Sequence, residues 1–170
     1  WHPESMNKKG SSERILVVGA GPAGLEAAMS LGRRGYEVAL TDPGQGGGRV
    51  ALEAKLPGLS SWQRVADYRL GQINKLANVT FYEGSYMEAP SIIEFEPHHV
   101  AIATGSGWRK DGVGRSTWRA VAGIEKEKEI FTPDDILVGR MPSRGPVIVY
   151  DDDHYYMGGV IAELLPSSGF

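Results

Sequence analysis

A glycine-rich turn between an apolar run and an amphipathic segment limits the possible folds of this chain more than any other feature. The run Ile15–Val18 is typical of a parallel strand buried on both faces. Residues 22–34 have the apolar spacing of a helix, and the glycines of residues 19–24 lie between the two. Residues 37–41 form a second apolar run. This order predicts a βαβ unit with a right-handed crossover, as in Rossmann-like α/β folds.

The glycines of the turn follow the G-x-G-x-x-G pattern of dinucleotide-binding proteins. In this pattern Gly19 permits the tight turn, Gly21 lets a pyrophosphate approach the backbone, and Gly24 allows the helix to pack closely on the strand. Pro22 and Ala23 complete the turn where the helix begins. Backbone N–H groups and the positive end of the helix macrodipole would then hold the phosphate charge.

An acidic residue follows the second strand at the spacing that such a site requires. Asp42 lies 18 residues after Gly24, close to the offset of about 20 residues expected for a carboxylate that accepts hydrogen bonds from the adenosine ribose. The same carboxylate would repel a 2′-phosphate, so we expect adenosine without one. The alternative is a purely structural βαβ turn in which Asp42 is a loop residue.

Two further loops are candidates for the same site. The cluster Gly46–Gly48 and Arg49 follow the ribose position, and the backbone at Gly48 and the guanidinium of Arg49 could approach the pyrophosphate. A flexible surface loop is the alternative. Thr104 and Gly105 follow another predicted strand as a small-residue turn of the kind that recurs beside nucleotide sites.

The rest of the chain continues the alternation of strands and helices. The pattern predicts a helix over about 60–77, strands over 79–83 and 99–103, and a short helix beginning at Pro133. Residues 91–96 fit a helix or a strand, and residues 107–123 look irregular. We expect a linker or arm over 1–13, a dinucleotide-binding domain over 14–140, and the start of a second, degenerate NAD(P)-type βα unit over 146–170.

The second βα unit repeats the first with its phosphate-binding glycines replaced. A predicted strand over 146–150 leads to Asp151, Asp152 and Asp153 and then to a helix over about 156–165. Three carboxylates at a helix N-terminus would repel a pyrophosphate, so we expect no NAD(P)H here. A metal site formed with His154 is the alternative to an acidic loop that caps the helix dipole, and we favour the loop. Because a helix that leaves a parallel strand must return to another strand, we expect a longer protein.

Composition excludes several classes of function. A net charge of −3 with mixed signs gives no basic stripe for nucleic acid. The apolar runs are far shorter than the ~20 residues that span a bilayer, and no signal segment precedes them. We therefore expect a soluble cytoplasmic protein with no membrane or nucleic-acid partner. The chain has no cysteine, which excludes thiolate catalysis and iron–sulfur ligation by this chain, and no catalytic residue is identifiable.

Beyond these motifs, segments along nearly the whole chain resemble the C-terminal part of the trimethylamine, dimethylamine and histamine dehydrogenase family. The resemblance rests on the segments WHPE, VVGAGPAGLEAA, LTDPGQGGGRV, LPGLSSWQRVADYR, HHVAIATGSGWRKDGV and VIVYDDDHYYMGGVIAELL. The last two segments make it closer to the histamine dehydrogenase branch than to the 2,4-dienoyl-CoA reductases.

This resemblance implies a fold, cofactors and partners. Members of the family are iron–sulfur flavoproteins with an N-terminal TIM barrel that carries FMN and a [4Fe–4S] cluster. Their C-terminal region has a glutathione-reductase-type FAD/NAD(P)-binding fold and holds ADP, and electrons pass from the amine through FMN and the cluster to an external acceptor. The resemblance implies that this chain is an incomplete copy of that fold, that the intact protein is a homodimer, and that the chain alone is inactive.

The resemblance carries over residue by residue only to the nucleotide site. It implies ADP contacts for Gly19, Gly21, Gly24, Asp42, Gly48 and Arg49. The loop between Asp42 and Gly47 looks about one residue shorter than is usual in the family. An alternative is the redox-active FAD domain of an NADH:flavin oxidoreductase, similar to 2,4-dienoyl-CoA reductase, and a third is a chain that binds no nucleotide and acts only in packing.

Overall fold

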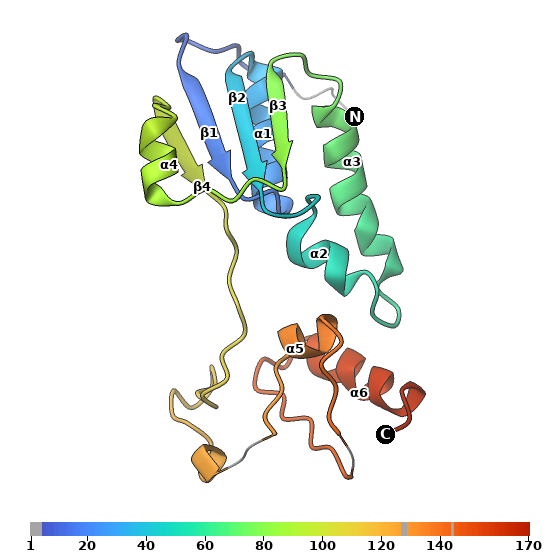
Figure 1. Ribbon diagram of the computed structural model, residues 1–170. Helices are drawn as coiled ribbons and strands as arrows, with labels where there is room; N and C mark the ends of the chain where they lie inside the picture. The colour runs from blue at the N-terminus through green and yellow to red at the C-terminus, as the bar shows by residue number, and fades with distance from the viewer. Residues whose placement is uncertain (1–4, 127–128, 144) are drawn as a thin grey trace. The chain divides into compact units, whose positions relative to one another are not determined.

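The chain forms two compact units, each described here by itself (Figure 1). The computed structural model describes residues 5–126, 129–143 and 145–170. The first unit runs to Ala54 and resumes at Ser61–Gly105, and the second comprises Lys55–Ser60 and Ser106–Phe170. The first four residues of the expected arm, and His2 with them, lie outside the described residues.

The first unit is a parallel sheet, as the βαβ pattern predicts. Its strands are β1 (Arg14–Val18), β2 (Glu37–Asp42), β3 (Val79–Glu83) and β4 (His99–Ile102), in the spatial order β3-β2-β1-β4. In the register of the sheet Ile15 of β1 lies opposite Val38 of β2 on one side and His99 of β4 on the other. The carboxyl ends of all four strands therefore lie along one edge, where open α/β sheets bind ligands.

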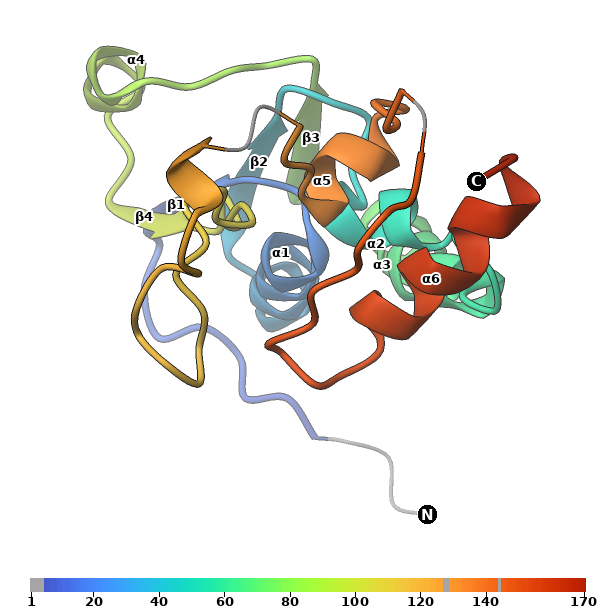
Figure 2. The same cartoon turned by 90° about the horizontal axis from the view of Figure 1, so that it is seen from below.

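Two helices cover one face of this sheet (Figure 2). Helix α1 (Pro22–Arg34) has the bounds that the sequence predicts, whereas α3 (Gln63–Ile73) is shorter than predicted and follows a 3-10 turn, η1 (Ser60–Trp62). The core between helices and strands consists of Ile15, Val17, Ala20, Leu25, Ala28, Met29, Val38, Leu40, Ala66 and Ile73. Alternate residues of β1 and β2 supply its strand side, since side chains on a strand alternate between the two faces.

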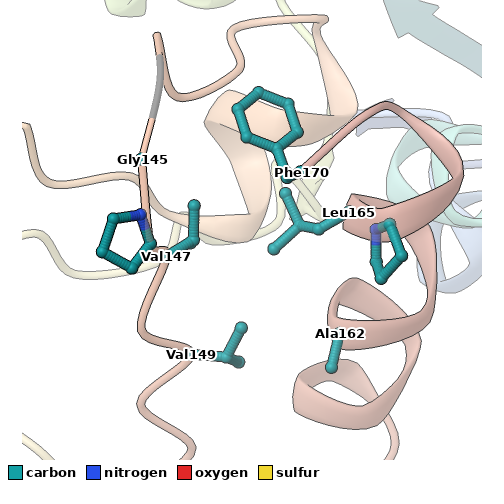
Figure 3. Close-up of a pocket in the computed structure, with 8 residues that line it drawn as sticks. Gly145, Val147, Val149, Ala162, Leu165 and Phe170 are labelled. Atoms are coloured by element: carbon teal, nitrogen blue, oxygen red, sulfur yellow. The ribbon is translucent and has the colours of Figure 1, made fainter.

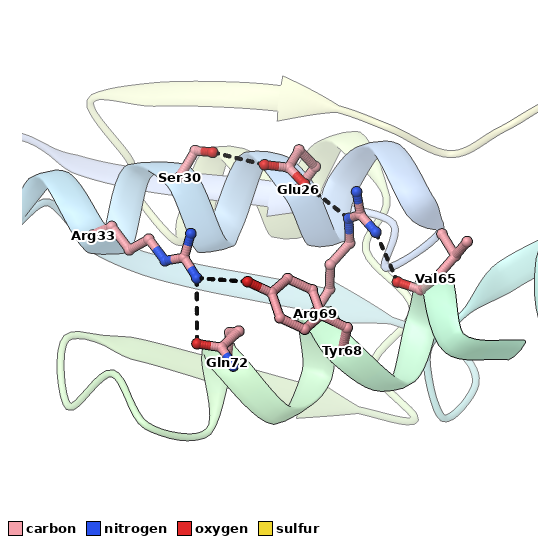
Figure 4. A network of polar contacts seen from close by, with 7 residues as sticks. All are labelled: Glu26, Ser30, Arg33, Val65, Tyr68, Arg69 and Gln72. Atoms are coloured by element: carbon pink, nitrogen blue, oxygen red, sulfur yellow. Dashed lines mark hydrogen bonds and ion pairs between the residues drawn. The ribbon is translucent and has the colours of Figure 1, made fainter. Parts of the chain in front are cut away.

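Side chains join α1 to α3 on the outside of the core (Figure 4). The Nε of Arg69 donates to Glu26 at 2.8 Å, and Nη2 of Arg33 donates to the hydroxyl of Tyr68 and to Oε1 of Gln72. Such partly exposed contacts each contribute little to stability. Together they fix the position of α3 along α1.

Short helices fill segments for which the sequence gives weak signals. The glycine-rich segment after β2 contains α2 (Gly48–Glu53), and α4 (Ala89–Glu94) decides the ambiguous segment before β4 in favour of a helix. Both have fewer residues than a helix needs for independent stability, so contacts with the rest of the unit hold them.

The second unit is built on two helices and a separate core. The helices are α5 (Pro133–Leu137) and α6 (Met157–Ser167), and a 3-10 turn, η2 (Ile124–Lys126), precedes them. The core contains Ile136, Met157, Ile161 and Leu165, together with Leu56 from the segment between α2 and α3. No helix in the described part of the chain is both long and apolar enough to span a membrane.

The prediction of a strand over residues 146–150 is wrong. These residues join no ladder with another strand of the described chain, and Ile148 is 90% exposed. Figure 3 shows the groove that results, with Val147 and Val149 on one side and Ala162 and Leu165 of α6 on the other. A strand needs a neighbour to pair its backbone groups, so an apolar sequence alone does not form one.

Candidate nucleotide site

The first glycine turn is held together by its own backbone. The N–H of Gly19, which has φ +101°, donates to the carbonyl of Thr41 at 2.8 Å. A Cβ atom at Gly19 would overlap the carbonyl of Ala103, and one at Gly24 would overlap the carbonyl of Gly19. Glycine at both positions is therefore required for β1, β4 and α1 to approach so closely, in agreement with the packing roles predicted for them.

Gly21 differs from its neighbours because its surroundings are open. It is the N-cap of α1 with φ −70° and ψ 179°, and a Cβ atom there would meet no atom within 4 Å. Pro22 occupies the first helical position, and Ala23 after it is exposed. Among the described residues no side chain caps this N-terminus, and its first turn holds no acidic residue. The positive end of α1 is thus left open toward an anion.

Asp42 ties the turn to the end of β2. Its Oδ2 accepts the N–H of Ala20 at 2.7 Å, and its Oδ1 accepts the N–H of Gly44 at 2.8 Å. A carboxylate has about four lone-pair sites, so two remain for other donors. The bond to Gly44 is an Asx-turn that the Asp-Pro-Gly sequence could have indicated, whereas nothing in the sequence indicates the bond to Ala20.

The second glycine cluster packs against the first turn. Gly46, Gly47 and Gly48 all have positive φ, of 86°, 91° and 53°. The N–H of Gly47 donates to the carbonyl of Ala20 at 2.8 Å, and a Cβ atom at Gly48 would lie 2.9 Å from Cα of Gly21. This segment is therefore part of the packed turn. Arg49 is the second residue of α2 and is half-buried.

Thr104 and Gly105 lie beside the same turn and are exposed. The preceding Ala103 donates its N–H to the carbonyl of Val18 at 2.8 Å, which extends β4 alongside β1. The fold thus brings all ten predicted cofactor residues to the carboxyl edge of the sheet: Gly19, Gly21, Pro22, Ala23, Gly24, Asp42, Gly48, Arg49, Thr104 and Gly105. Contact of these residues with a nucleotide stays a prediction.

The aspartates of the second turn accept hydrogen bonds from, or pair with, groups of their own unit. Asp151 accepts the backbone N–H groups of Asp153 and His154, and Asp152 accepts the N–H of Ser116 at 2.8 Å, which lowers the pKa of Asp152. Asp153 lies 3.6 Å from Arg115. Helix α6 begins after the N-cap Tyr156, without a side-chain cap hydrogen bond, and the expectation that the acidic loop caps the helix dipole stays a prediction.

A buried carboxylate in the second unit was missed by the sequence analysis. Asp135 is 3% exposed, accepts the backbone N–H and the hydroxyl of Thr132, and pairs with Lys110 and Arg140. The N–H of Thr132 and the Lys110 ammonium are the main causes that lower the pKa of Asp135 to about 2. Thr132 and Asp135 form a capping box, a spacing that the sequence does contain.

In the part of the chain that the structure describes, the histidines form no metal site. His98 accepts the N–H of Arg14 through Nδ1, His99 lies 3.4 Å from Glu13, and His154 has φ +54° in the acidic turn. Within the described ranges no group of three His, Cys, Asp or Glu side chains could hold a metal ion.

Several known proteins similar to this chain have the names of oxidoreductases. The profile of the pyridine nucleotide-disulphide oxidoreductases matches residues 13–134. Dimethylamine dehydrogenase of Hyphomicrobium sp. (strain x) is 35% identical over 99% of this chain and 24% of its own length. The structure of 6-hydroxypseudooxynicotine amine oxidase from Pseudomonas geniculata N1 is 47% identical, with a TM-score of 0.92 over 99% of this chain and 25% of that chain.

The structure of histamine dehydrogenase from Rhizobium sp. 4-9 is 49% identical, with a TM-score of 0.86 over 99% of this chain and 26% of that one. These matches confirm the resemblance to the amine dehydrogenases that the sequence motifs carry, and with it the α/β fold of FAD/NAD-binding type. The chain spans about a quarter of the length of the relatives it matches.

Proposed function

The chain belongs to the pyridine nucleotide-disulphide oxidoreductase family, and from this premise we propose that its first unit holds the ADP part of a nucleotide within a longer amine dehydrogenase. One observation carries the proposal. The backbone at Gly21 borders open space at an α1 N-terminus that has neither a side-chain cap nor an acidic residue in its first turn. A pyrophosphate needs such a combination of exposed N–H groups, positive helix end and absent side chains.

Each neighbouring residue has a role in this proposal. The start of α1, from Gly21 through Pro22 and Ala23, faces the pyrophosphate. Asp42 accepts the ribose hydroxyls with the lone pairs that Ala20 and Gly44 leave available. A 2′-phosphate would place negative charge beside this carboxylate, so the site favours ADP over its 2′-phosphorylated counterpart.

The loops beside the turn complete the site. Gly48 and Arg49 approach the phosphates from α2, and Thr104 with Gly105 bounds the site after β4. The second turn plays no part in binding NAD(P)H, because the carboxylate of Asp151 occupies the backbone N–H groups of Asp153 and His154 there. Those N–H groups are the kind that a phosphate would need.

In the longer protein this unit would be a structural nucleotide domain, apart from the chemistry. The relatives are named for amine oxidation, and FMN and a [4Fe–4S] cluster supply the redox chemistry that the resemblance implies. This chain has no cysteine to ligate a cluster, and the resemblance implies that an N-terminal barrel holds both groups. The external electron acceptor, the homodimer and the cytoplasmic location belong to the same proposal.

The identity of the nucleotide is tested by denaturing the purified chain and analysing what it releases by chromatography with mass detection. ADP without flavin supports the proposal. Release of FAD would favour the alternative, a redox-active FAD domain of a reductase. No nucleotide, combined with no binding of added ADP in calorimetry, would refute nucleotide binding by this chain.

The place of binding is tested with two glycine substitutions in the first unit. Gly21→Ala and Gly71→Ala both add a Cβ atom that meets nothing within 4 Å, so the unliganded fold should accept both. The methyl group at Gly21 would project into the proposed phosphate site, whereas Gly71 lies on α3. We expect Gly21→Ala to weaken ADP binding at least about tenfold, with Gly71→Ala unchanged. Equal affinity in both variants would place the ligand elsewhere.

A further inference from the structure

The strand order of the first unit matches the order of the parts of a nucleotide. The sheet runs β3-β2-β1-β4, so β2 lies between β1 and β3 (Figure 1). The turn with Gly21 follows β1, β2 ends at Asp42, and Glu83 at the end of β3 lies opposite Asp42 in the register. Neighbouring strands are about 4.8 Å apart. A nucleotide with its pyrophosphate at Gly21 and its ribose at Asp42 would therefore extend its base over the residues that follow β3.

The segment after β3, residues 84–88, is fixed beside the predicted ribose carboxylate. Its turn begins at Gly84, which has φ +66°. The N–H of Ser85 donates to the carbonyl of Asp42 at 2.9 Å, and the N–H of Gly84 donates to the carbonyl of Gly44 at 3.3 Å. These bonds hold the segment to the same two residues that form the Asx-turn. The next residue along the chain, Tyr86, therefore starts from a fixed backbone.

Tyr86 carries the one aromatic ring of this segment, and it is 71% exposed. In the described part of the chain no hydrogen bond or ring contact holds its side chain. Two other tyrosines of the first unit do have such contacts, since Arg34 lies over the ring of Tyr36 and Arg33 donates to the hydroxyl of Tyr68. An exposed ring beside a predicted ribose position is available to stack on the face of a base.

We propose that Tyr86 is a specificity-determining residue of the nucleotide site and that its ring stacks on the adenine. This inference rests on the proposed function, since it adds the base to the pyrophosphate and ribose of the same ligand. An aromatic ring can stack on any base, but it favours a purine because the larger face of a purine covers more of the ring. The site therefore prefers a purine over a pyrimidine nucleoside diphosphate, and Tyr86 sets that preference.

The affinities for ADP and CDP test the proposal, because these two ligands share the pyrophosphate and the ribose and differ only in the base. By calorimetry we expect Tyr86→Ala to weaken ADP binding about tenfold and CDP binding about threefold or less, so the preference for ADP narrows. Tyr86→Phe keeps the ring and should keep both wild-type affinities. The matched control is Tyr68→Ala, which removes a ring that is 54% exposed on α3. In this control both affinities should stay within about twofold of wild type.

Stacking also has a spectroscopic signature that a purely structural role would lack. In NMR spectra with tyrosine-selective labelling, the ring resonance that Tyr86→Phe removes belongs to Tyr86. It should move upfield when ADP is added to the wild-type chain, because the ring current of the adenine shields protons that lie over its face. This measurement gives the answer even if Tyr86→Ala does not fold. An unmoved resonance at saturating ADP would overturn the proposal.

The two proposals fail in different ways. If the wild-type chain does not bind ADP, nucleotide binding itself is refuted and the role of Tyr86 falls with it. If wild type binds ADP and Tyr86→Ala binds it equally well, only the inference about Tyr86 is refuted. Equal losses of ADP and CDP affinity in Tyr86→Ala would also overturn its role in selecting the base, because Tyr86 would then only support the loop.

Discussion

The glycine turn before α1 and the acidic turn before α6 share a spacing of small residues and use it in different ways. Gly24 and Gly158 occupy matching positions 134 residues apart, and neither has room for a side chain. At Gly24 the nearest atom is the backbone carbonyl of Gly19, while at Gly158 it is the side chain of Asp151. A glycine at the start of a helix therefore permits close approach, and the approaching group decides what the turn can do.

The two turns differ in which acceptors their backbone N–H groups meet. In the first turn the start of α1 has no side-chain cap and Gly21 borders open space. In the second turn Asp151 accepts the N–H groups of Asp153 and His154. The first turn leaves the N-terminus of α1 without a side-chain cap, whereas the second turn uses its N–H groups to hold its own fold.

The largest effect is expected from adding a methyl group to the first turn. Gly24→Ala would place Cβ onto the carbonyl of Gly19, which cannot move unless β1 and α1 separate. We expect it to destabilise the first unit by about 3 kcal/mol, the upper end for overpacking. Gly158→Ala meets a side chain that can rotate and should cost about 1 kcal/mol. Urea unfolding of both variants measures this, and equal losses would erase the contrast between the turns.

A smaller effect is expected from Asp42. Asp42→Ala leaves the N–H groups of Ala20 and Gly44 without their carboxylate, at a cost of about 1–3 kcal/mol for an unsatisfied donor. ADP affinity should fall with it. The control is Asp67→Ala, because Asp67 accepts only a side-chain bond from Gln63 on the surface of α3. If the two variants unfold at the same urea concentration, Asp42 does not hold the turn.

Acid should destabilise the second unit through protonation of Asp135. The pKa of this carboxyl is lowered from 3.8 to about 2 in the folded chain, so its contribution to stability is complete above pH 4 and is lost as pH falls toward 2. Asp135→Asn should lower Tm at pH 7 and flatten its decline between pH 4 and 2. Parallel Tm curves for wild type and variant would show that Lys110 and Arg140 do not favour the charged form.

The smallest effects are expected within the acidic turn. Asp152→Ala removes the acceptor for the N–H of Ser116, whereas Asp153→Ala removes only an exposed pair with Arg115. Asp152→Ala should lower Tm modestly and Asp153→Ala hardly at all, since exposed ion pairs contribute little. Neither should alter ADP affinity. A gain of ADP binding at this turn in either variant would show that charge alone distinguishes the two turns.

Local patterns predict the elements of this chain well where periodicity and end signals agree. Helix α1 runs from Pro22 to Arg34 and ends at Gly35 as expected, and the short helix α5 begins at Pro133 behind its Thr132 cap. The predicted helix over 60–77 ends early at Ile73. Asn74 follows that end directly and is a residue that can stop a helix, but the apolar spacing continues to Leu76 and favours a longer helix.

For the candidate site, the sequence identifies the residues and their spacing but not the hydrogen bonds that these residues make with distant parts of the chain. The offset between Gly24 and Asp42 predicts a ribose carboxylate. It does not predict that Asp42 accepts the N–H of Ala20 or that Gly47 donates to Ala20. These bonds join residues that are far apart in the chain, and local propensity carries no information on them.

The sequence by itself determined the strand, turn and helix that build the candidate nucleotide site, because glycine spacing and apolar periodicity act over a few residues. The tertiary structure alone decided that residues 146–150 stay unpaired and that Leu56 leaves the first unit to join the second core. Pairing and burial depend on which distant segments meet. That outcome is set by packing of the whole unit, where each buried side chain needs partners that the local sequence does not name.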